Sequence, residues 1–243
     1  MKKWIGLFLL LGGNLHAQSL RVAVAANAQF VIEPLRKAFQ KTTGVSVEAI
    51  VSSSGKLTTQ IQQGAPFDIL LSADTEYPKT LQKEGLALEA PVVYAYGTLV
   101  LWTQTKLPIQ ANLKELLSPE VHHIAVANPS VAPYGEAAFT AMQRLKILPH
   151  LQSKVIYGES IAQVNQYVLS GAAEVGFTAK SVVLNPELEK KGRWIEIPGH
   201  LYQPIAQAVV IIKRTTKPEA ARQFIRFLRS TEGKRILREY GYH

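Results

Sequence analysis

The stretch 52-SSSGKLT-58 has the residue types of an anion-binding loop. A Gly-Lys pair beside hydroxyl residues suggests the loop that holds nucleotide phosphates. That loop needs a glycine five positions before its second glycine, and Ser or Thr directly after the lysine. Ile50 and Leu57 occupy these two positions, so the nucleotide interpretation fails. Three serines and a glycine at an expected helix start still predict a place where backbone N–H groups hold an anion.

Four turns share this character, because each follows an expected strand and begins an expected helix. They are 25-AANAQ-29, 52-SSSG-55, 128-NPSVAPYGEA-137 and 158-GESIAQ-163. The first N–H groups of a helix lack intrahelical partners, and the helix dipole places positive charge at the same end. Four such ends facing one cleft would bind a compact, multiply charged oxyanion without a salt bridge. A cage of donors alone also rejects a protonated oxygen, which needs an acceptor.

Each turn also has a simpler interpretation. Ser, Asn and Gly are ordinary residues at helix starts, and capping alone explains any one of them. The dipole favours an acidic residue such as Glu159 in a first turn, Tyr134 could be a packing aromatic, and Lys56 is expected to be solvated. The repetition of the same turn in both halves of the chain favours the binding interpretation, without naming the ligand.

Strand-like and helical patterns alternate along the chain, which predicts an α/β fold with mostly parallel sheets flanked by helices. The first series comprises strands at 20–26, 45–51 and 68–73 and helices at 30–43, 57–63 and 76–84. The second comprises helices near 112–117, 135–146 and 161–169 and strands at 124–128, 154–157 and 174–179. A β run at 206–212 and helices at 218–229 and 231–239 complete the pattern.

Long β segments near 92–102 and 200–212 join the two series. We expect two lobes, with lobe 1 formed by residues 18–97 and 206–243 and lobe 2 by residues 98–205. Ligands of open α/β sheets bind at the carboxyl ends of the strands, so the four turns should line a cleft between the lobes. The two crossover strands would then act as a hinge that closes this cleft.

The first 17 residues have the pattern of a secretory signal. Lys2 and Lys3 make a basic start, an apolar run follows, and small residues precede an expected cleavage near Ala17-Gln18. The apolar run is too short for a membrane-spanning helix, which needs about 20 residues. The sequence contains no cysteine, which excludes disulfides and a lipid anchor at the cleavage site. We therefore expect a free protein outside the cytoplasm, most simply in a periplasm.

The chain of 243 residues has a formal charge of +9, which falls to +7 when the signal is removed. A basic surface suits nucleic acid, acidic membranes or an anionic ligand. The expected export argues against nucleic acid, as does the lack of stretches that interleave basic and aromatic residues. An anionic ligand remains the best match to the four turns.

The sequence gives no support for catalysis or for a metal site. Ser54 is a candidate nucleophile, but a serine nucleophile needs a nearby base. His122, His123, His150 and His200 fall in expected loops and His243 lies at position 243, so no histidine falls in the four turns. No cluster of His, Asp and Glu has metal-ligand spacing. The sequence therefore favours a non-catalytic binding protein.

A set of motifs carries a more specific resemblance. The segments 24-VAAN-27, 52-SSSGKL-57, 67-FDILLSAD-74, 128-NPSVAPYG-135, 158-GES-160 and 176-GFTA-179 together resemble the periplasmic molybdate-binding proteins that feed ABC transporters. Each motif alone is weak, but their order and spacing match along nearly the whole mature chain. The resemblance implies a two-lobed type II periplasmic binding fold, without a cofactor, that acts as a monomer. It further implies that molybdate or tungstate is held by uncharged hydrogen bonds, with no direct protein–metal ligand, and delivered to a membrane permease.

The resemblance also implies which residues hold the ion. The family's first ligand falls on Asn27, and the serine that offers both its hydroxyl and its N–H falls on Ser54. The two backbone donors fall on Tyr134 and Ile161. Some members add a tyrosine hydroxyl where this chain has Ala179, so either Asn27 takes over that bond or the cage has one donor fewer. Some relatives also carry a hydroxyl where this chain has Ala26.

The identity of the ion stays open at this point. Molybdate and tungstate are tetrahedral dianions of nearly the same size, so the sequence does not rank them. Another oxyanion, such as sulfate or a phosphonate, is the alternative ligand.

Overall fold

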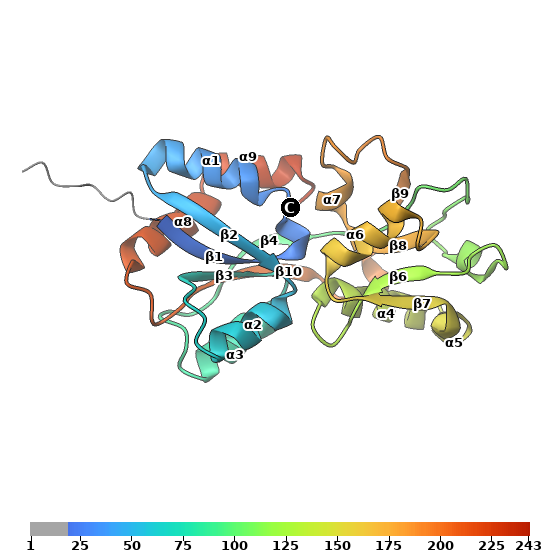
Figure 1. The fold of residues 1–243 in the computed structure, drawn as a ribbon, viewed down its shortest axis with the longest axis horizontal. Coiled ribbons are helices and arrows are strands. Elements are labelled where there is room, and N and C mark those ends of the chain that lie inside the picture. The colour runs from blue at the N-terminus through green and yellow to red at the C-terminus, as the bar shows by residue number, and fades with distance from the viewer. Residues whose placement is uncertain (1–18) are drawn as a thin grey trace, which may run out of the picture.

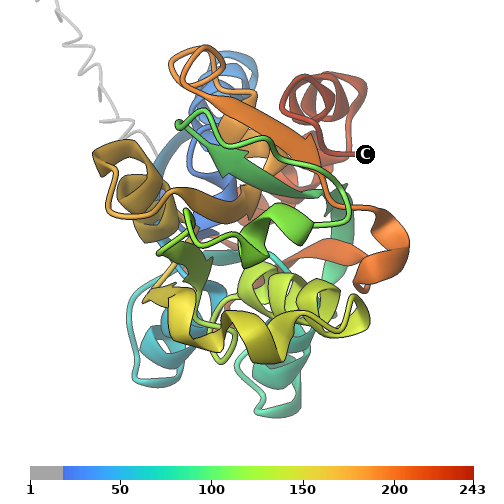
Figure 2. The ribbon, with the colours of Figure 1, turned by 90° about the vertical axis from the view of Figure 1, so that its right-hand side faces the viewer.

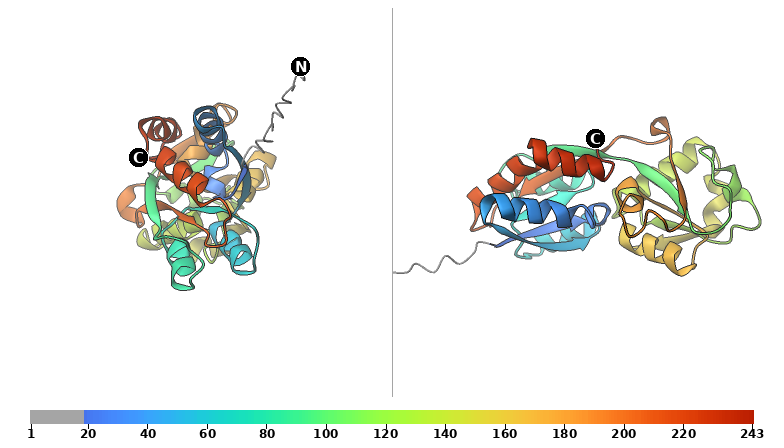
Figure 3. Two further views of the ribbon diagram at one scale, coloured as in Figure 1. Left: turned by 90° about the vertical axis from the view of Figure 1, so that its left-hand side faces the viewer. Right: turned by 90° about the horizontal axis from the view of Figure 1, so that it is seen from above.

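Two α/β lobes lie side by side in the computed structural model, which describes residues 19–243 (Figure 1). Each lobe is built on one five-stranded sheet. A view from above shows the two lobes as separate bodies joined by extended segments (Figure 3). The predicted secretory signal at 1–17 lies outside the described residues.

The first lobe has a sheet with the strand order β2-β1-β3-β10-β4. Four strands point the same way and β10 runs against them, because β1 pairs in parallel with β2 and β3 while β10 is antiparallel to β3 and β4. The strands are β1 (Ser19–Ala25), β2 (Ser46–Ser52), β3 (Ile69–Ser72), β4 (Val92–Gly97) and β10 (Ile205–Ile211).

The second lobe repeats this arrangement with the strand order β7-β6-β8-β5-β9 (Figure 2). Here β5 is the strand that opposes the others, since it is antiparallel to β8 and β9 while β6 is parallel to β7 and β8. The strands are β5 (Leu99–Thr103), β6 (Ile124–Ala127), β7 (Val155–Gly158), β8 (Val175–Ala179) and β9 (Arg193–Glu196).

Helices flank both sheets. Those of the first lobe are α1 (Ile32–Thr43), α2 (Ser54–Gln62), α3 (Glu76–Lys83), α8 (Pro218–Leu228) and α9 (Thr231–Glu239). Those of the second are α4 (Pro133–Arg144), α5 (Leu148–Leu151), α6 (Ile161–Ser170) and α7 (Lys180–Val183). Short 3-10 helices are η1 (Ala26–Ala28), η2 (Lys114–Leu117), η3 (Gln152–Lys154) and η4 (Gly199–Leu201).

The first sheet is covered on both faces. Helices α1, α8 and α9 lie on one face, and α2 and α3 lie on the other (Figure 1). Phe39 of α1 meets Phe224 of α8 edge-on, with ring centroids 5.0 Å apart. On the opposite face Leu57 and Ile61 of α2 share a fully buried cluster with Leu81 of α3. Each such side chain contributes about 1.5–3 kcal/mol by burial, which fixes α2 against the sheet.

The chain passes from one lobe to the other through a glycine. β4 of the first sheet ends at Gly97 and β5 of the second begins at Leu99, so the β-rich run at 92–102 is two strands in different sheets. A Cβ added at Gly97 would lie 2.0 Å from the Tyr134 hydroxyl, so only glycine fits here. The chain returns to the first sheet at Ile205, the first residue of β10.

The two-lobed α/β fold predicted from the sequence is confirmed, and both sheets are mixed. Helix α2 begins at Ser54 rather than near residue 57, because its first turn carries small polar residues outside the apolar pattern. The helix expected at 112–117 is only a short 3-10 turn. The sequence pattern does not predict the short elements β9, α5 and α7.

Candidate functional site

The four predicted turns meet at the junction of the two lobes. Those after β1 and β2 come from the first lobe, and those after β6 and β7 from the second, because parallel strands end at the same edge of a sheet. Together they line one cavity. Its ten lining residues, none of them charged, are Ala25, Ala26, Asn27, Ser53, Ser54, Ala73, Ala132, Pro133, Tyr134 and Ile161. The structure thus brings all four sequence-predicted site residues together.

This cavity is small. The volume open to the centre of a water molecule is about 10 Å³, roughly the space that one water requires. Such a space favours a compact ligand, and the lobes must move to admit any ion larger than one water molecule.

Ser54 presents two donors to the cavity. Its Oγ accepts a hydrogen bond from the Ala73 N–H at 3.0 Å, so the hydroxyl proton is left to donate elsewhere. The Ser54 N–H belongs to the first turn of α2 and has no partner within residues 19–243. The Ser54 side chain is nearly fully buried, so neither donor is satisfied by bulk water.

Tyr134 offers its backbone N–H from the first turn of α4. The preceding turn is fixed by the Asn128 carbonyl, which accepts from the N–H groups of Val131 and Ala132 at 3.1 and 2.9 Å. Pro133 then starts the helix with a preset φ. The Tyr134 N–H has no partner within the described residues. Burial raises the pKa of the Tyr134 hydroxyl well above its ordinary value, so the ring adds no charge to the site.

Ile161 provides the equivalent group at the start of α6. Ser160 precedes the helix in an extended conformation and accepts through its carbonyl from the N–H groups of Gln163 and Val164. The Ile161 N–H comes before these bonds begin and has no partner in residues 19–243. Ile161 thus has a backbone N–H at the cavity that is free within the described chain, and its apolar side chain packs into the core of the second lobe.

The side-chain amide of Asn27 donates its hydrogen bonds to other side chains of the protein. Its Nδ2 donates to Gln207 Oε1 and to Tyr242 Oη, both at 2.8 Å. The Gln207 amide is itself oriented, because its Nε2 donates to the carbonyls of Ala73 and Ile205. Asn27 Nδ2 is therefore engaged inside the protein, and its Oδ1 is buried without a partner. Sequence reasoning missed Gln207 and Tyr242, which have no local motif that marks them.

Some family members have a tyrosine hydroxyl where this chain has Ala179, and two positions show what stands in its place. Ala179 is fully buried at the end of β8 and does not line the cavity. Ser53, which sequence reasoning did not select, lines the cavity and has a buried Oγ without a partner. The run of three serines at residues 52–54 marks this loop as polar, but the run alone does not show which of the serines lines the cavity.

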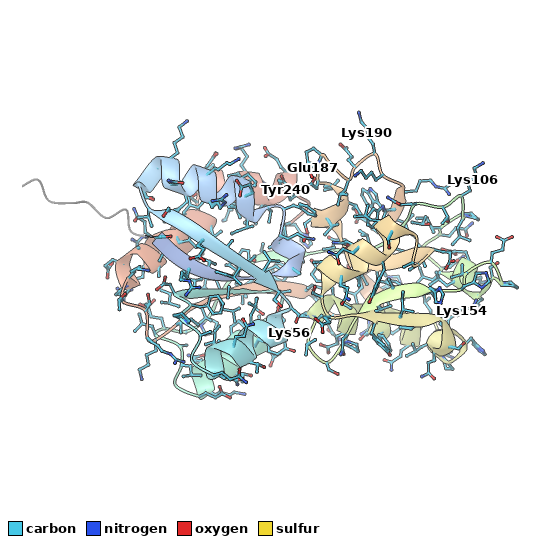
Figure 4. All side chains as sticks on the ribbon, viewed as in Figure 1. Lys56, Lys106, Lys154, Glu187, Lys190 and Tyr240 are labelled. Atoms are coloured by element: carbon cyan, nitrogen blue, oxygen red, sulfur yellow. The ribbon has the colours of Figure 1, made fainter. Side chains whose placement is uncertain are left out.

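The lobes touch each other around this cavity. The Gly55 N–H donates to the Val131 carbonyl at 3.0 Å, and the Ser181 hydroxyl donates to the Asn27 carbonyl at 2.6 Å. Lys56 stays partly exposed, and its ammonium also pairs with the Glu159 carboxylate of the other lobe. Figure 4 places Lys56 where α2 meets the second lobe. These contacts hold the two lobes in a closed arrangement.

Comparison with known proteins identifies the family. The family model described as bacterial extracellular solute-binding protein matches residues 20–243. The chain is a bacterial extracellular solute-binding protein. This solute-binding protein is 38% identical over 241 residues to the molybdate-binding protein ModA of Rhodobacter capsulatus, covering 97% of this chain and 93% of the relative. It is 35% identical over 234 residues to ModA of Azotobacter vinelandii, covering 96% and 93%.

Solved structures agree with this assignment. The periplasmic molybdate-binding protein of Azotobacter vinelandii superposes with a TM-score of 0.88 at 33% identity, over 92% of this solute-binding protein and 98% of that chain. The sulfate-binding protein SubI of Mycobacterium tuberculosis has a TM-score of 0.79 at 15% identity, over 93% and 86%, which shows a shared fold alone. The resemblance to the molybdate-binding family is confirmed.

The family consists of solute-binding proteins and not of enzymes, which confirms the non-catalytic assignment. Within residues 19–243, no group of three or more His, Cys, Asp or Glu side chains could hold a metal ion. The same part of the chain has no helix with the length and apolar character needed to cross a membrane.

An acidic pocket adjoins the interlobe cavity of this solute-binding protein. It has a volume of about 320 Å³ and is lined by Asp74, Glu76 and Glu136 among others, and it shares Ala73 with the cavity. Burial raises the pKa of the Asp74 carboxyl to about 6, against the lowering effect of hydrogen bonds from the Ser72 hydroxyl and the Tyr77 N–H. Asp74 therefore titrates close to neutral pH.

We expect Asp74→Asn to raise the free energy of unfolding at pH 8 by roughly 1–3 kcal/mol and to raise it less at pH 4.5. The pKa of this carboxyl is about 6 in the folded protein, against an ordinary value of 3.8. The folded state therefore holds the proton more tightly, and the contribution of Asp74 to stability falls as the pH rises from about 4 to 6. Asparagine keeps the Oδ1 acceptor but cannot ionise.

Urea unfolding of both proteins at pH 4.5 and pH 8 measures this difference. A gap between the two proteins that is equal at the two pH values would contradict the assigned titration.

Proposed function

We propose that this solute-binding protein captures molybdate in the interlobe cavity, in the periplasm, and delivers it to the membrane permease of an ABC transporter. The observation that carries the proposal is the convergence of uncharged donors on one compact cavity. These donors are the N–H groups of Ser54, Tyr134 and Ile161 and the hydroxyl of Ser54. Relatives at 38% and 35% identity over nearly their full length are named molybdate-binding proteins, which supports this ligand.

The chemistry of the cavity suits a doubly charged oxyanion. Each oxygen of such an ion accepts hydrogen bonds, and a bond to a charged group contributes roughly 1.5–3 kcal/mol. The N-termini of α2, α4 and α6 add partial positive charge at the same place. Since none of the ten lining residues is charged, the ion is held by dipoles that its own charge strengthens. No charged side chain of the cavity forms an ion pair with the ion, so no ion pair has to break when the ion is released.

Other tetrahedral oxyanions are the alternatives to molybdate. Tungstate has the same shape and charge as molybdate, so we propose that it binds at the same site. Sulfate and a phosphonate remain the alternative ligands.

Binding is proposed to couple to closure of the lobes. Residues 18–97 and 206–243 would form one body and residues 98–205 the other, with the crossovers at Gly97 and before Ile205 as the hinge. The contact between Gly55 and Val131 forms only when the lobes meet, so closure over the ion changes the surface that the permease receives. One chain supplies all four turns, and we propose that the protein works as a monomer.

Calorimetric titration of the mature protein with molybdate, tungstate, sulfate and phosphate tests the proposal. We expect tight binding of molybdate and tungstate and much weaker binding of sulfate and phosphate. Tight binding of sulfate without a response to molybdate would overturn the assignment.

A further inference from the structure

Ser53 occupies a helix-capping position without acting as a cap. It lies between β2 and α2, with φ −70° and ψ 150°, the extended conformation of an N-cap residue. A serine at this position normally accepts a hydrogen bond from the second or third N–H of the helix. Ser230 does so for α9, where its Oγ accepts from the Gly233 N–H at 3.1 Å. The Ser53 side chain makes no such bond.

The Ser53 hydroxyl is also buried without any other partner. The residue is 3% exposed. Within residues 19–243 only three buried side-chain N or O atoms lack a partner, namely Asn27 Oδ1, Ser53 Oγ and Asn165 Nδ2. Buried polar groups are satisfied in the great majority of cases, and an unsatisfied one destabilises the fold. An unsatisfied hydroxyl that the protein retains therefore needs an explanation.

The location of Ser53 supplies that explanation. Two of the three unpartnered atoms belong to residues that line the anion cavity, Asn27 and Ser53. Asn27 Oδ1 can only accept a hydrogen bond and cannot bind an anion. The Ser53 hydroxyl can donate. Alanines 25, 26, 73 and 132 are four of the other nine lining residues, so an alanine at position 53 would match its surroundings without leaving a hydroxyl unpaired.

We propose that the Ser53 hydroxyl is a further hydrogen-bond donor to the bound oxyanion. It supplies the side-chain hydroxyl that the chain lacks at Ala26 and Ala179, while the Asn27 amide is engaged with Gln207 and Tyr242. This inference rests on the proposed function, since it assigns a donor to the same ion in the same cavity. Ser53 and Ser54 would then approach the ion together from the start of α2.

Titration of the Ser53→Ala protein with molybdate tests the inference. We expect the affinity to fall about 10- to 100-fold, the scale of one hydrogen bond to a charged group. Ser53→Cys keeps a similar side-chain volume but has only a weak donor, so it should fall nearly as far. Ser52→Ala is the matched control, because Ser52 ends β2 and does not line the cavity. It should bind as the wild type does.

Thermal unfolding without molybdate provides the second readout. Ser53→Ala should unfold at the same temperature as the wild type or above it, because the substitution removes an unpaired buried hydroxyl. A lower unfolding temperature would show that Ser53 has a structural partner, and would overturn the inference.

The outcomes separate the inference from the function on which it rests. If the wild type binds molybdate and Ser53→Ala binds it equally well, the role of Ser53 is wrong and the proposed function stands. If the wild type does not bind molybdate, both are wrong.

Discussion

Replacing Gly55 with alanine is expected to weaken molybdate binding by roughly 10- to 100-fold, the equivalent of the 1–3 kcal/mol that overpacking typically costs. A Cβ at this position would lie 2.9 Å from Val131 Cα and 3.0 Å from Val131 Cβ, atoms of the opposite lobe. The clash with Val131 exists only when the lobes are closed. Alanine would therefore act as a wedge that favours the open arrangement and so opposes capture of the ion.

The same Cβ would also lie 2.7 Å from the Tyr77 hydroxyl, which belongs to the same lobe as Gly55. Tyr77→Phe removes that atom together with its hydrogen bond to the Ser130 carbonyl of the other lobe, at 3.1 Å. The double variant Gly55→Ala/Tyr77→Phe is therefore compared with Tyr77→Phe alone, which isolates the clash between the lobes. Gly199→Ala is the matched control, because a Cβ at Gly199 meets no atom within 4 Å. It should bind molybdate with unchanged affinity.

Calorimetry gives the affinity of these variants, and small-angle scattering with and without molybdate reports whether the lobes close. Thermal unfolding of the ligand-free double variant should match that of Tyr77→Phe alone. Affinity and compaction of the double variant equal to those of Tyr77→Phe would show that closure does not require the close approach of Gly55 to Val131.

Replacing Ser54 with alanine is expected to lower molybdate affinity about 10- to 100-fold, which corresponds to the roughly 1.5–3 kcal/mol of a hydrogen bond to a charged group. The hydroxyl is oriented to donate, because its oxygen already accepts from the Ala73 N–H at 3.0 Å. Alanine also leaves that N–H unpaired, so the free energy of unfolding should fall by about 1–3 kcal/mol.

This second effect distinguishes Ser54 from Ser53. Ser54→Ala should lose both affinity and stability, whereas Ser53→Ala should lose affinity alone. Titration with molybdate and urea unfolding of the two variants measure the contrast. An unchanged affinity of Ser54→Ala would remove Ser54 from the site.

Local signals account for the parts of the fold and site that could be predicted. Ser54 and Ile161 follow strands and begin helices. The end of a strand and the start of a helix can both be recognised from the few residues around them. Gly97 interrupts a β-rich run at the place where the chain changes sheets. The convergence of the four turns then follows from the rule that parallel strands end at one edge of a sheet.

Contacts between distant residues account for what the sequence did not show. Asn27 donates to Gln207 and Tyr242, which lie 180 and 215 positions away. No local pattern links such residues, so the engagement of the Asn27 amide was not predictable. The pairing of Lys56 with Glu159, 103 positions apart, escaped for the same reason. The position of β10 between β3 and β4 likewise depends on contacts throughout the lobe and not on a local sequence pattern.

The contact between Asn27 and Tyr242 has a consequence for how the protein is made. Asn27 is among the first residues of the described chain to be synthesised, yet the Tyr242 hydroxyl that orients it follows 215 positions later. Contacts of such sequence separation form late, because loop closure must precede them. In a chain still emerging from the ribosome, Asn27 therefore lacks this contact. The turn after β1, which lines the cavity, is fully braced only once the chain through residue 242 has folded.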